Sequence, residues 1–545
     1  MTARVDAELA LLIDVGSAWT KAGVVAKARG RWRLVAHVAQ PSAWGDDELR
    51  GALAQQLARS ADARLVDRLQ ALIAGANRIE SHTPRRPGRI AVVAVSRELS
   101  GGSARRAAEA AGWEVVETVT LDDGRRLADR LAILQAAEVD AWLLAGGFDD
   151  ARSQRALEAA ALVASARRPG GGPVIWAGST MLSEDVAELF ESGATIVADN
   201  PRPDPRREEL PRVRERLLAV LRSTLAGEDE TQLATVALPR AVGALAAASR
   251  MRILAVDVGA RAALRALSES DGTVVSRVHA RGGLGGLAAL PGAAARVARL
   301  AGDAGDESAV ADLLQTLRAR PSTMPQTPED LSATHAATVV ALAGMLEEGP
   351  PSGLDLLIGG GRSIAGAPSA PHAARMLLDG VRPVGVTQLA IDAAGLLAPL
   401  GSLPDDEIRE GMALLADDLL APLGTAVVTR GGELGRLAMR VTVHRPGWPT
   451  SQPIEVRGGQ LQVVPLGRGQ QAEVHIELGD GVGLGSARRS PRIAALATGG
   501  ALGLVLDARG VPIALPRRGD DRRAMLASWR EALSRETPPG VERIA

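Results

Sequence analysis

The sequence contains no cysteine and no tyrosine, and its only lysines are Lys21 and Lys27. Without cysteine, disulfides, thiol nucleophiles and cysteine-ligated metals are excluded, and the absence fits a reducing compartment. No apolar run is long enough to span a bilayer, and the N-terminus lacks the hydrophobic segment of a signal peptide. We therefore expect a soluble, cytoplasmic protein without a membrane partner.

The chain also has no excess of positive or negative charge. The 63 Lys and Arg residues nearly balance the 64 Asp and Glu residues, which gives a net charge of −1. Proteins that bind nucleic acid over a broad surface normally carry a basic excess, so we expect no nucleic-acid partner. The seven histidines show no metal-ligand spacing, and no Ser-His-Asp or paired-carboxylate arrangement stands out. The length predicts about two to four domains.

Two short apolar runs end in Asp-x-Gly. The first is Leu-Leu-Ile-Asp-Val-Gly-Ser-Ala-Trp-Thr-Lys at 11–21, and the second is Ile-Leu-Ala-Val-Asp-Val-Gly-Ala at 253–260. Each run is typical of a buried strand, and the glycine after it indicates a turn. A carboxylate at a strand end can hold Mg²⁺ through water, and the backbone beside a glycine can approach phosphate oxygens. Two such ends are typical of a two-lobed ATP clamp.

The first turn supplies the candidate phosphate ligands. We expect Asp14 to position Mg²⁺, and Gly16 and Ser17 to offer backbone donors to the phosphates of ATP. Thr20 and Lys21 follow on the outgoing strand, where they would lie near the same phosphates. An ordinary β-turn with a polar tip is the alternative, because Asp-Val-Gly-Ser alone is weak evidence.

The second turn is degenerate. It begins with Asp257 and Gly259, which we expect to face the first turn as the second Mg²⁺ carboxylate and its glycine. An active clamp would continue with another glycine, hydroxyl residues and a carboxylate, but this chain has Ala, Ala, Ala and Leu at those places. Losing polar groups that act in the transition state commonly costs about 10²-fold in rate. A structural remnant and a working site both stay open.

Further glycine-rich strand ends occur along the chain. In Leu-Ile-Gly-Gly-Gly-Arg-Ser, we expect Gly359, Gly360 and Gly361 to pack against adenosine, with a plain turn as the alternative. The middle of the chain contains Gly-Gly-Phe-Asp-Asp at 146–150 and Ala-Gly-Ser at 177–179. These could form a ligand crevice at the carboxyl ends of parallel strands, but plain connections are the favoured interpretation.

The order of elements predicts an α/β fold. Three strands joined by tight turns open the chain, and strands then alternate with helices, as in a parallel sheet covered on both faces. Residues 46–75 are expected to be helical, and 79–89 to form a polar loop. From about residue 435, short alternating strands indicate an all-β region that a helix at 519–534 closes.

These patterns predict three parts. They are an N-terminal lobe at 1–248 with an inserted α/β subdomain at about 88–200, a second lobe at 249–430, and a β-rich C-terminal domain at 431–545 that ends in a helix.

Several longer segments are more distinctive than the Asp-x-Gly turns. They include Leu-Leu-Ala-Gly-Gly-Phe-Asp at 143–149, Pro-Val-Ile-Trp-Ala-Gly at 173–178, Leu-Pro-Arg-Ala-Val at 238–242, Val-Arg-Pro-Val-Gly-Val-Thr-Gln-Leu-Ala-Ile-Asp at 381–392, and Gly-Ala-Leu-Gly-Leu-Val-Leu-Asp-Ala-Arg-Gly at 500–510. With the opening motif, they make the chain resemble long-form members of the glutamate mutase L family over nearly its whole length.

The resemblance implies a two-lobed actin-like (ASKHA, ribonuclease H-like) ATPase fold, with ATP and Mg²⁺ as ligands. It also implies a chaperone-like accessory role beside an adenosylcobalamin-dependent mutase. The chain departs from the family pattern at 146–151, 257–264 and 280–285, where acidic and hydroxyl residues are missing. These departures indicate weakened Mg²⁺ handling and lost or weak hydrolysis, as in a pseudoenzyme.

Three functions therefore stay open. The first is an accessory protein that acts through a protein partner, with a mutase and a second copy of the chain as candidates. The second is an active ATPase or small-molecule kinase of the same superfamily. The third is a scaffold that binds no nucleotide and acts through its C-terminal β domain.

Overall fold

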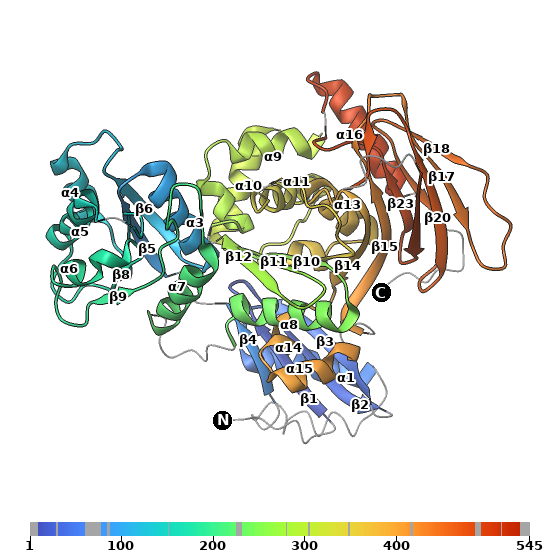
Figure 1. The fold of residues 1–545 in the computed structure, drawn as a ribbon. Coiled ribbons are helices and arrows are strands. Elements are labelled where there is room, and N and C mark those ends of the chain that lie inside the picture. The colour runs from blue at the N-terminus through green and yellow to red at the C-terminus, as the bar shows by residue number, and fades with distance from the viewer. Residues whose placement is uncertain are drawn as a thin grey trace. The chain divides into compact units, whose positions relative to one another are not determined.

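The computed structural model describes residues 9–28, 31–59, 78–83, 88–150, 152–224, 232–279, 281–302, 306–346, 349–414, 418–485, 492–513 and 515–534. The chain forms two compact units (Figure 1). The inserted unit comprises residues 84–230 and 277–280, and the main unit comprises 1–83, 231–276 and 281–545. Because this division does not separate two lobes, the predicted limits at 248 and 430 stay predictions. Every helix in the described ranges is too short or too polar to cross a membrane.

The inserted unit is a parallel sheet between two layers of helices. Its strands are β5 (Arg89–Ala94), β6 (Glu114–Thr120), β7 (Ala141–Ala145), β8 (Val174–Trp176) and β9 (Thr195–Val197), in the order β6-β5-β7-β8-β9. Its longer helices are α3 (Gly102–Ala110), α4 (Leu127–Ala136), α5 (Gln154–Ala166) and α7 (Leu210–Thr224). Separate buried clusters lie on the two faces of the sheet. The predicted parallel sheet with covered faces is confirmed, and its strand order is that of a flavodoxin-like doubly wound fold.

The first lobe of the main unit is a four-stranded sheet. Its strands are β1 (Leu9–Val15), β2 (Trp19–Ala28), β3 (Arg31–Pro41) and β4 (Arg78–His82), in the order β3-β2-β1-β4. Helix α1 (Asp46–Arg59) packs on this sheet and confirms the first half of the helix expected at 46–75. The rest of that helix lies outside the described residues.

The polar loop expected at 79–89 is wrong over its first part. Strand β4 pairs in parallel with β1, and Ile79 and Ser81 are buried while their neighbours are only half-buried. The hydrophobic signal was weak because a single apolar side chain, Ile79, carries the alternation. Pairing with β1 supplies the backbone hydrogen bonds that fix these residues as a strand.

The second lobe repeats the first. Its sheet contains β10 (Ile253–Val258), β11 (Ala263–Ser268), β12 (Val274–His279), β13 (Leu356–Gly360), β14 (Gly385–Asp392) and β15 (Leu420–Val428). The order β12-β11-β10-β13 matches β3-β2-β1-β4, and β10 is antiparallel to β11 and parallel to β13, as β1 is to β2 and β4. This duplication is the two-lobed arrangement of an actin-like fold, so the predicted fold class is confirmed.

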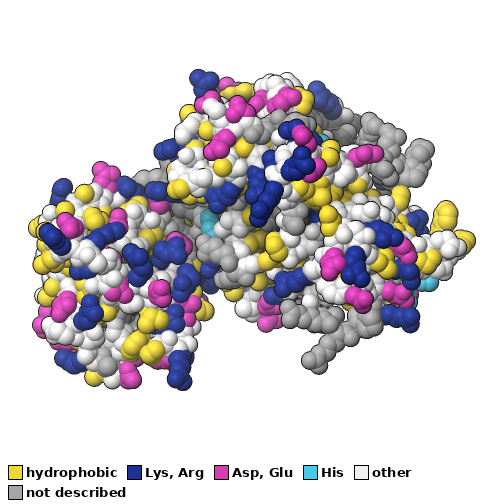
Figure 2. Space-filling view, turned by 90° about the horizontal axis from the view of Figure 1, so that it is seen from above, with side chains coloured by type: hydrophobic (Ala, Val, Ile, Leu, Met, Phe, Trp, Pro, Cys, Tyr) yellow, Lys and Arg dark blue, Asp and Glu magenta, His cyan; other side chains and the backbone are white. Residues whose placement is uncertain are grey.

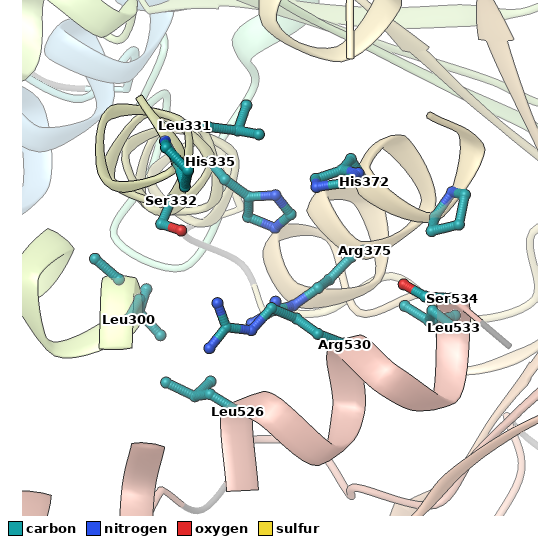
Figure 3. A pocket seen from close by; sticks show the side chains of 13 residues that line it. Leu300, Leu331, Ser332, His335, His372, Arg375, Leu526, Arg530, Leu533 and Ser534 are labelled. Carbon is teal, nitrogen blue, oxygen red and sulfur yellow. The ribbon is translucent and has the colours of Figure 1, made fainter. Parts of the chain in front are cut away.

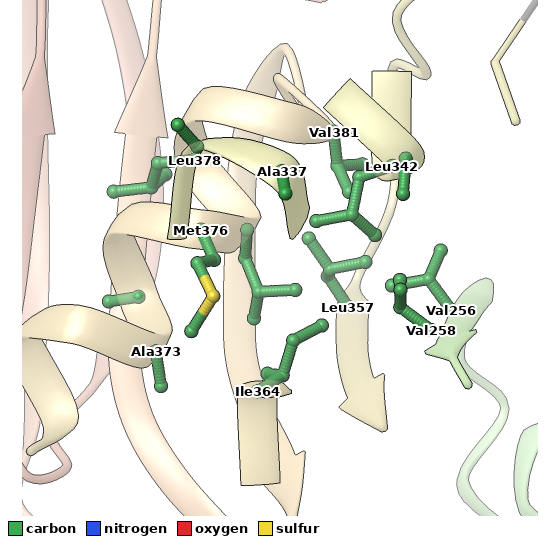
Figure 4. Close-up of a cluster of buried hydrophobic side chains, with 14 of the residues drawn as sticks. Val256, Val258, Ala337, Leu342, Leu357, Ile364, Ala373, Met376, Leu378 and Val381 are labelled. Carbon is green, nitrogen blue, oxygen red and sulfur yellow. The ribbon is translucent and has the colours of Figure 1, made fainter. Parts of the chain in front are cut away.

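Helices cover one face of the second sheet. They are α9 (Ala293–Ala301), α10 (Glu307–Ala319), α11 (Pro328–Gly344) and α13 (Ala370–Gly380). Figure 4 shows Val256 and Leu357 from the strands beside Leu342 from α11, and Leu378 from α13 belongs to the same buried cluster. This core holds β10 and β13, whose ends carry the candidate site, in a fixed register.

The C-terminal region is β-rich, as predicted, and two of its strands extend the second sheet. Strands β23 (Gly503–Asp507) and β19 (Leu461–Val464) follow β15 in that sheet. Strands β18 (Ile454–Arg457), β17 (Leu437–His444), β20 (Gln471–Leu478) and β22 (Arg492–Thr498) form a second, antiparallel sheet. Residues of both sheets, such as Met439 and Leu504, share one buried cluster. Helix α16 (Gly519–Ser534) contacts α13 and β19.

A buried ion network fastens β23 to α13. The Arg509 guanidinium lies 2.7 Å from Asp507 and 2.6 Å from Asp379, and its side chain has no exposed surface. Despite burial, the charges of Arg509 and Arg375 lower the pKa of Asp379 to about 2. Arg382 donates to the carbonyl of Gly510. The distinctive segments at 381–392 and 500–510 therefore supply groups that join the C-terminal region to the second lobe.

Replacing Arg509 with Met should lower the free energy of unfolding of the main unit by about 3–5 kcal/mol, because two buried carboxylates each lose their closest guanidinium group. Urea unfolding followed by circular dichroism measures the change. Arg523→Met is the matched control, since Arg523 pairs with Asp520 at the exposed start of α16 and such pairs contribute at most about 1 kcal/mol. Equal effects of the two substitutions would contradict this role for the network.

Candidate functional site

Asp14 is fixed by its two neighbouring strands. It lies opposite Lys21 on β2 and Ser81 on β4 in the sheet register. The Ser81 hydroxyl donates to Oδ1 of Asp14 at 2.8 Å, and Nζ of Lys21 lies 2.5 Å from Oδ2. The carboxylate is buried, so both oxygens are held at defined positions near the end of β1.

The turn after Asp14 is tight and braced. The Gly16 N–H donates to the Trp19 carbonyl at 3.0 Å, and a side chain at Gly16 would put Cβ only 2.5 Å from that carbonyl oxygen. The Ser42 hydroxyl donates to the Gly16 carbonyl at 2.8 Å and accepts from Thr20 at 3.0 Å. Thr20 therefore braces the turn from within. Ser17 is half-buried, and its side chain has no hydrogen-bond partner in the described part of the chain.

The second turn repeats this geometry. The Gly259 N–H donates to the Ala262 carbonyl at 3.0 Å, the same spacing as in the first turn. Asp257 occupies the register position of Asp14, but its partners across the strands are Leu264 and Gly360 instead of a lysine and a serine. The structure thus keeps the carboxylate of the second copy and lacks the polar groups that hold the first.

The three glycines at the end of β13 have different surroundings. A Cβ at Gly360 would lie 2.7 Å from Oδ2 of Asp257. Gly361 has φ of +84°, and a Cβ there would lie only 2.2 Å from the carbonyl oxygen of Val258. A Cβ at Gly359 would instead meet Ile364 at 2.8 Å and Leu377 at 2.9 Å. Gly360 and Gly361 therefore line the carboxylate, whereas Gly359 faces the core. Their contact with adenosine stays a prediction.

Lys21 carries the ammonium group on which the nearby carboxylates act. Burial by itself would lower the pKa of its ammonium group, but the charges of Asp14, Asp257 and Asp392 outweigh this effect and raise it. The structure thus brings Asp14 and Asp257 near Lys21, while their roles as ligands stay predictions. It also places Asp392 near Lys21, a carboxylate that the sequence reasoning missed. All three carboxylates follow apolar strands, on β1, β10 and β14.

Asp392 is held by backbone groups. It accepts hydrogen bonds from the amides of Leu396 at 3.1 Å and Leu397 at 2.9 Å, at the start of α14 (Leu397–Gly401). A Cβ at Gly395, where φ is +68°, would lie 3.0 Å from Cδ of Lys21. The signal in the sequence was the apolar strand that ends in Asp392, but the glycine two residues later that marks the other two turns is absent.

The site is short of positive charge. Burial raises the pKa of Asp257, with Lys21 opposing and Asp14 reinforcing the shift. Burial also raises the pKa of Asp392 to about 6, although its backbone donors favour the ionised form. Three carboxylates face one ammonium group, so a divalent cation would relieve the imbalance, and carboxylate oxygens suit Mg²⁺. In the described ranges, no three His, Cys, Asp or Glu side chains are close enough to share one ion directly, so contact would run through water.

A second cation lies beside the first turn. The Arg362 guanidinium, directly after Gly361, stacks over the Trp19 ring at 4.8 Å. Arg362 is half-buried, and burial lowers its pKa without removing its charge at neutral pH. Sequence reasoning did not select Arg362 or Trp19, because their contact joins residues far apart in the chain.

The strand-end turns of the inserted unit are closed by their own hydrogen bonds. Gly147 has φ of +77°, and the Asn200 amide donates to its carbonyl at 2.9 Å and to Asp149 at 3.1 Å. The Ser179 N–H donates to the Gly146 carbonyl at 3.0 Å. These contacts fit the interpretation of 146–150 and 177–179 as connections.

A family model described as "MutL protein" matches residues 10–419. No curated protein matches the sequence. Among solved structures, the chain is similar to component A of (R)-2-hydroxyglutaryl-CoA dehydratase from Acidaminococcus fermentans, with 8% identity, coverage of 72% of this chain and 96% of that chain, and a TM-score of 0.24.

Two further solved structures are similar at the same low level. Nucleotide-free acetone carboxylase has 10% identity, coverage of 82% of this chain and 81% of that chain, and a TM-score of 0.28. Xylulose kinase from Bifidobacterium adolescentis has 10% identity, coverage of 77% and 96%, and a TM-score of 0.22. Scores of this size support no inference about the activity of this chain.

The raised pKa of Asp392 predicts a pH-dependent stability. The fold binds its proton more tightly than the unfolded chain does, so this contribution is fully present below about pH 4 and is lost as the pH rises through 6. Between those values, the free energy of unfolding should fall by up to about 3 kcal/mol relative to that of Asp392→Asn, which has no such proton. Urea unfolding of both proteins across this range measures the difference, and parallel curves would contradict it.

Proposed function

The chain belongs to the MutL protein family, and on that premise we propose that it is an accessory protein that binds Mg²⁺ and ATP weakly, hydrolyses ATP poorly or not at all, and acts through a partner protein. The observation that carries the proposal is the meeting of Asp14, Asp257 and Asp392 around Lys21. This arrangement joins the two lobes at the ends of their duplicated strands, which is where an actin-like clamp holds its nucleotide.

The residues present fit a phosphate-bearing ligand with a hard cation. Asp14 and Asp257 would hold Mg²⁺ through water, and Lys21 would contact phosphate oxygens. The turn at Gly16 and Ser17 would add backbone donors. The bound nucleotide would supply the charge that draws the two lobes together, and their closure would change the surface offered to a partner.

The residues of the second turn are the reason for proposing weak or absent hydrolysis of ATP. Ala260 and Ala262 stand where the family pattern has a glycine and a threonine, and Leu264 replaces an aspartate directly across from Asp257. These side chains cannot donate to a phosphate or orient a water molecule. The proposed partner is an adenosylcobalamin-dependent mutase, as the family suggests, or a second copy of the chain.

An active ATPase or small-molecule kinase is the first alternative, and a scaffold without nucleotide is the second. Isothermal titration separates them. We expect Mg²⁺-ATP to bind with a micromolar to millimolar dissociation constant and removal of Mg²⁺ to weaken binding about tenfold or more. In the Asp257→Asn variant, removal of Mg²⁺ should change the dissociation constant for ATP very little, because the cation has lost one of its carboxylates.

Asp480→Asn is the matched control, since Asp480 is exposed in a turn between β20 and β21 (Val482–Gly483). It should behave like the unmodified protein. Absence of heat up to millimolar ATP would contradict the proposal and favour the scaffold. Phosphate release at about 1 s⁻¹ or faster, typical of an enzyme, would favour the ATPase or kinase.

A further inference from the structure

A cavity lies among four helices of the main unit, apart from the site around Lys21. Its volume is about 230 Å³, and its walls come from α9, α11, α13 and α16. Helix α16 lies beyond residue 419, where the match to the family model ends. The C-terminal region therefore supplies one wall of a pocket whose other walls belong to the second lobe.

One end of the cavity carries basic and hydrogen-bonding groups. Figure 3 shows His335 from α11, Arg375 from α13 and Arg530 from α16 directed toward the same space, with His372 nearby. The rings of His335 and His372 lie 6.4 Å apart, and the His372 Nδ1 bonds to the Ser369 hydroxyl at 2.8 Å. Side chains from three separate elements thus converge on one space.

The His335 ring has unused hydrogen-bonding capacity. The Nε2 atom of His335 is buried and has no partner among the described residues. Burial and the nearby Arg375 lower the pKa of His335 to about 3, so its ring is neutral and can donate one N–H. A buried polar atom without a partner is costly, which indicates that a ligand or water fills this space.

The positive charge at this end is only partly balanced. Nε of Arg375 lies 3.2 Å from Asp379, which Arg509 also binds. Arg530 is half-buried, and within the described ranges it forms neither an ion pair nor a hydrogen bond. One guanidinium group is therefore left to meet an anion, and a planar guanidinium matches a carboxylate in a two-point contact.

Apolar side chains line the cavity around the basic groups. They are Leu300, Leu331 and Leu526 together with two prolines, Pro328 and Pro371. The volume corresponds to about eight water molecules, which suits a small ligand. A guanidinium group surrounded by apolar side chains suits a molecule with one charged group and a short hydrocarbon body.

We propose that this cavity binds a small monocarboxylate, with its carboxylate at Arg530, Arg375 and His335 and its hydrocarbon chain against the leucines. A single net charge is preferred because Asp379 already neutralises part of the basic end. The cavity shares no residue with the proposed nucleotide site, so ligand binding there can be tested independently of the proposed function.

Ligand-observed NMR titration with butyrate tests the proposal on the full-length protein. Butyrate should bind in the millimolar range or tighter, and butyramide, which has nearly the same shape and no charge, should bind about tenfold more weakly or not at all. Inorganic phosphate should also bind more weakly, because it leaves the apolar side chains without contact. Equal binding of butyrate and butyramide, or of butyrate and phosphate, would overturn the proposal.

Arg530→Gln should weaken butyrate binding about tenfold or more, because it removes the unpaired charge and keeps most of the side-chain length. Arg523→Gln, on the exposed part of the same helix, should leave binding unchanged. Circular dichroism shows whether both variants fold. Equal effects of the two variants, or absence of butyrate binding by the unmodified protein, would overturn the proposal, and the comparison with butyramide needs no variant.

Discussion

The candidate site depends on one ammonium group that lies among three buried carboxylates. Lys21 comes from the first lobe with Asp14, whereas Asp257 and Asp392 come from the second, so the charge balance links the two copies of the duplicated sheet. Burial opposes ionisation of Asp257 and Asp392, and the fold alone does not supply enough positive charge to reverse this. We propose that the same deficit in positive charge, which lowers the stability of the fold, favours binding of a hard cation, and we place Mg²⁺ and phosphate there for that reason.

The duplication also explains why the two halves of the site differ. In both lobes a strand ends in Asp-x-Gly, turns through the same hydrogen bond and returns antiparallel. The first copy has a lysine and a serine opposite its aspartate, and the second has Leu264 and Gly360. Backbone geometry is the same in the two copies, whereas the polar side chains opposite the aspartate are present in the first copy and absent from the second. That difference between the two copies is the basis on which we propose nucleotide binding without efficient hydrolysis.

Sequence patterns predicted what depends on local periodicity. Strand β17 and helix α16 lie where the pattern predicted them, because β17 alternates apolar and polar residues and α16 has apolar residues three and four positions apart. Strand β4 was missed because only Ile79 carries its apolar signal, and its identity comes from pairing with β1. Asp392 was missed for the same kind of reason. No glycine stands two residues after it, as in the other two turns, and only the order of strands in the folded sheet brings it to Lys21.

The most direct test of the central claim is a crystal structure with Mn²⁺ and a non-hydrolysable ATP analogue, in which anomalous scattering locates the metal. The account predicts Mn²⁺ bound through water to Asp14 and Asp257, with phosphate oxygens within hydrogen-bonding distance of Lys21 and the backbone at Gly16 and Ser17. Metal and phosphates bound elsewhere, with Lys21 still paired only to its carboxylates, would contradict the assignment of this site.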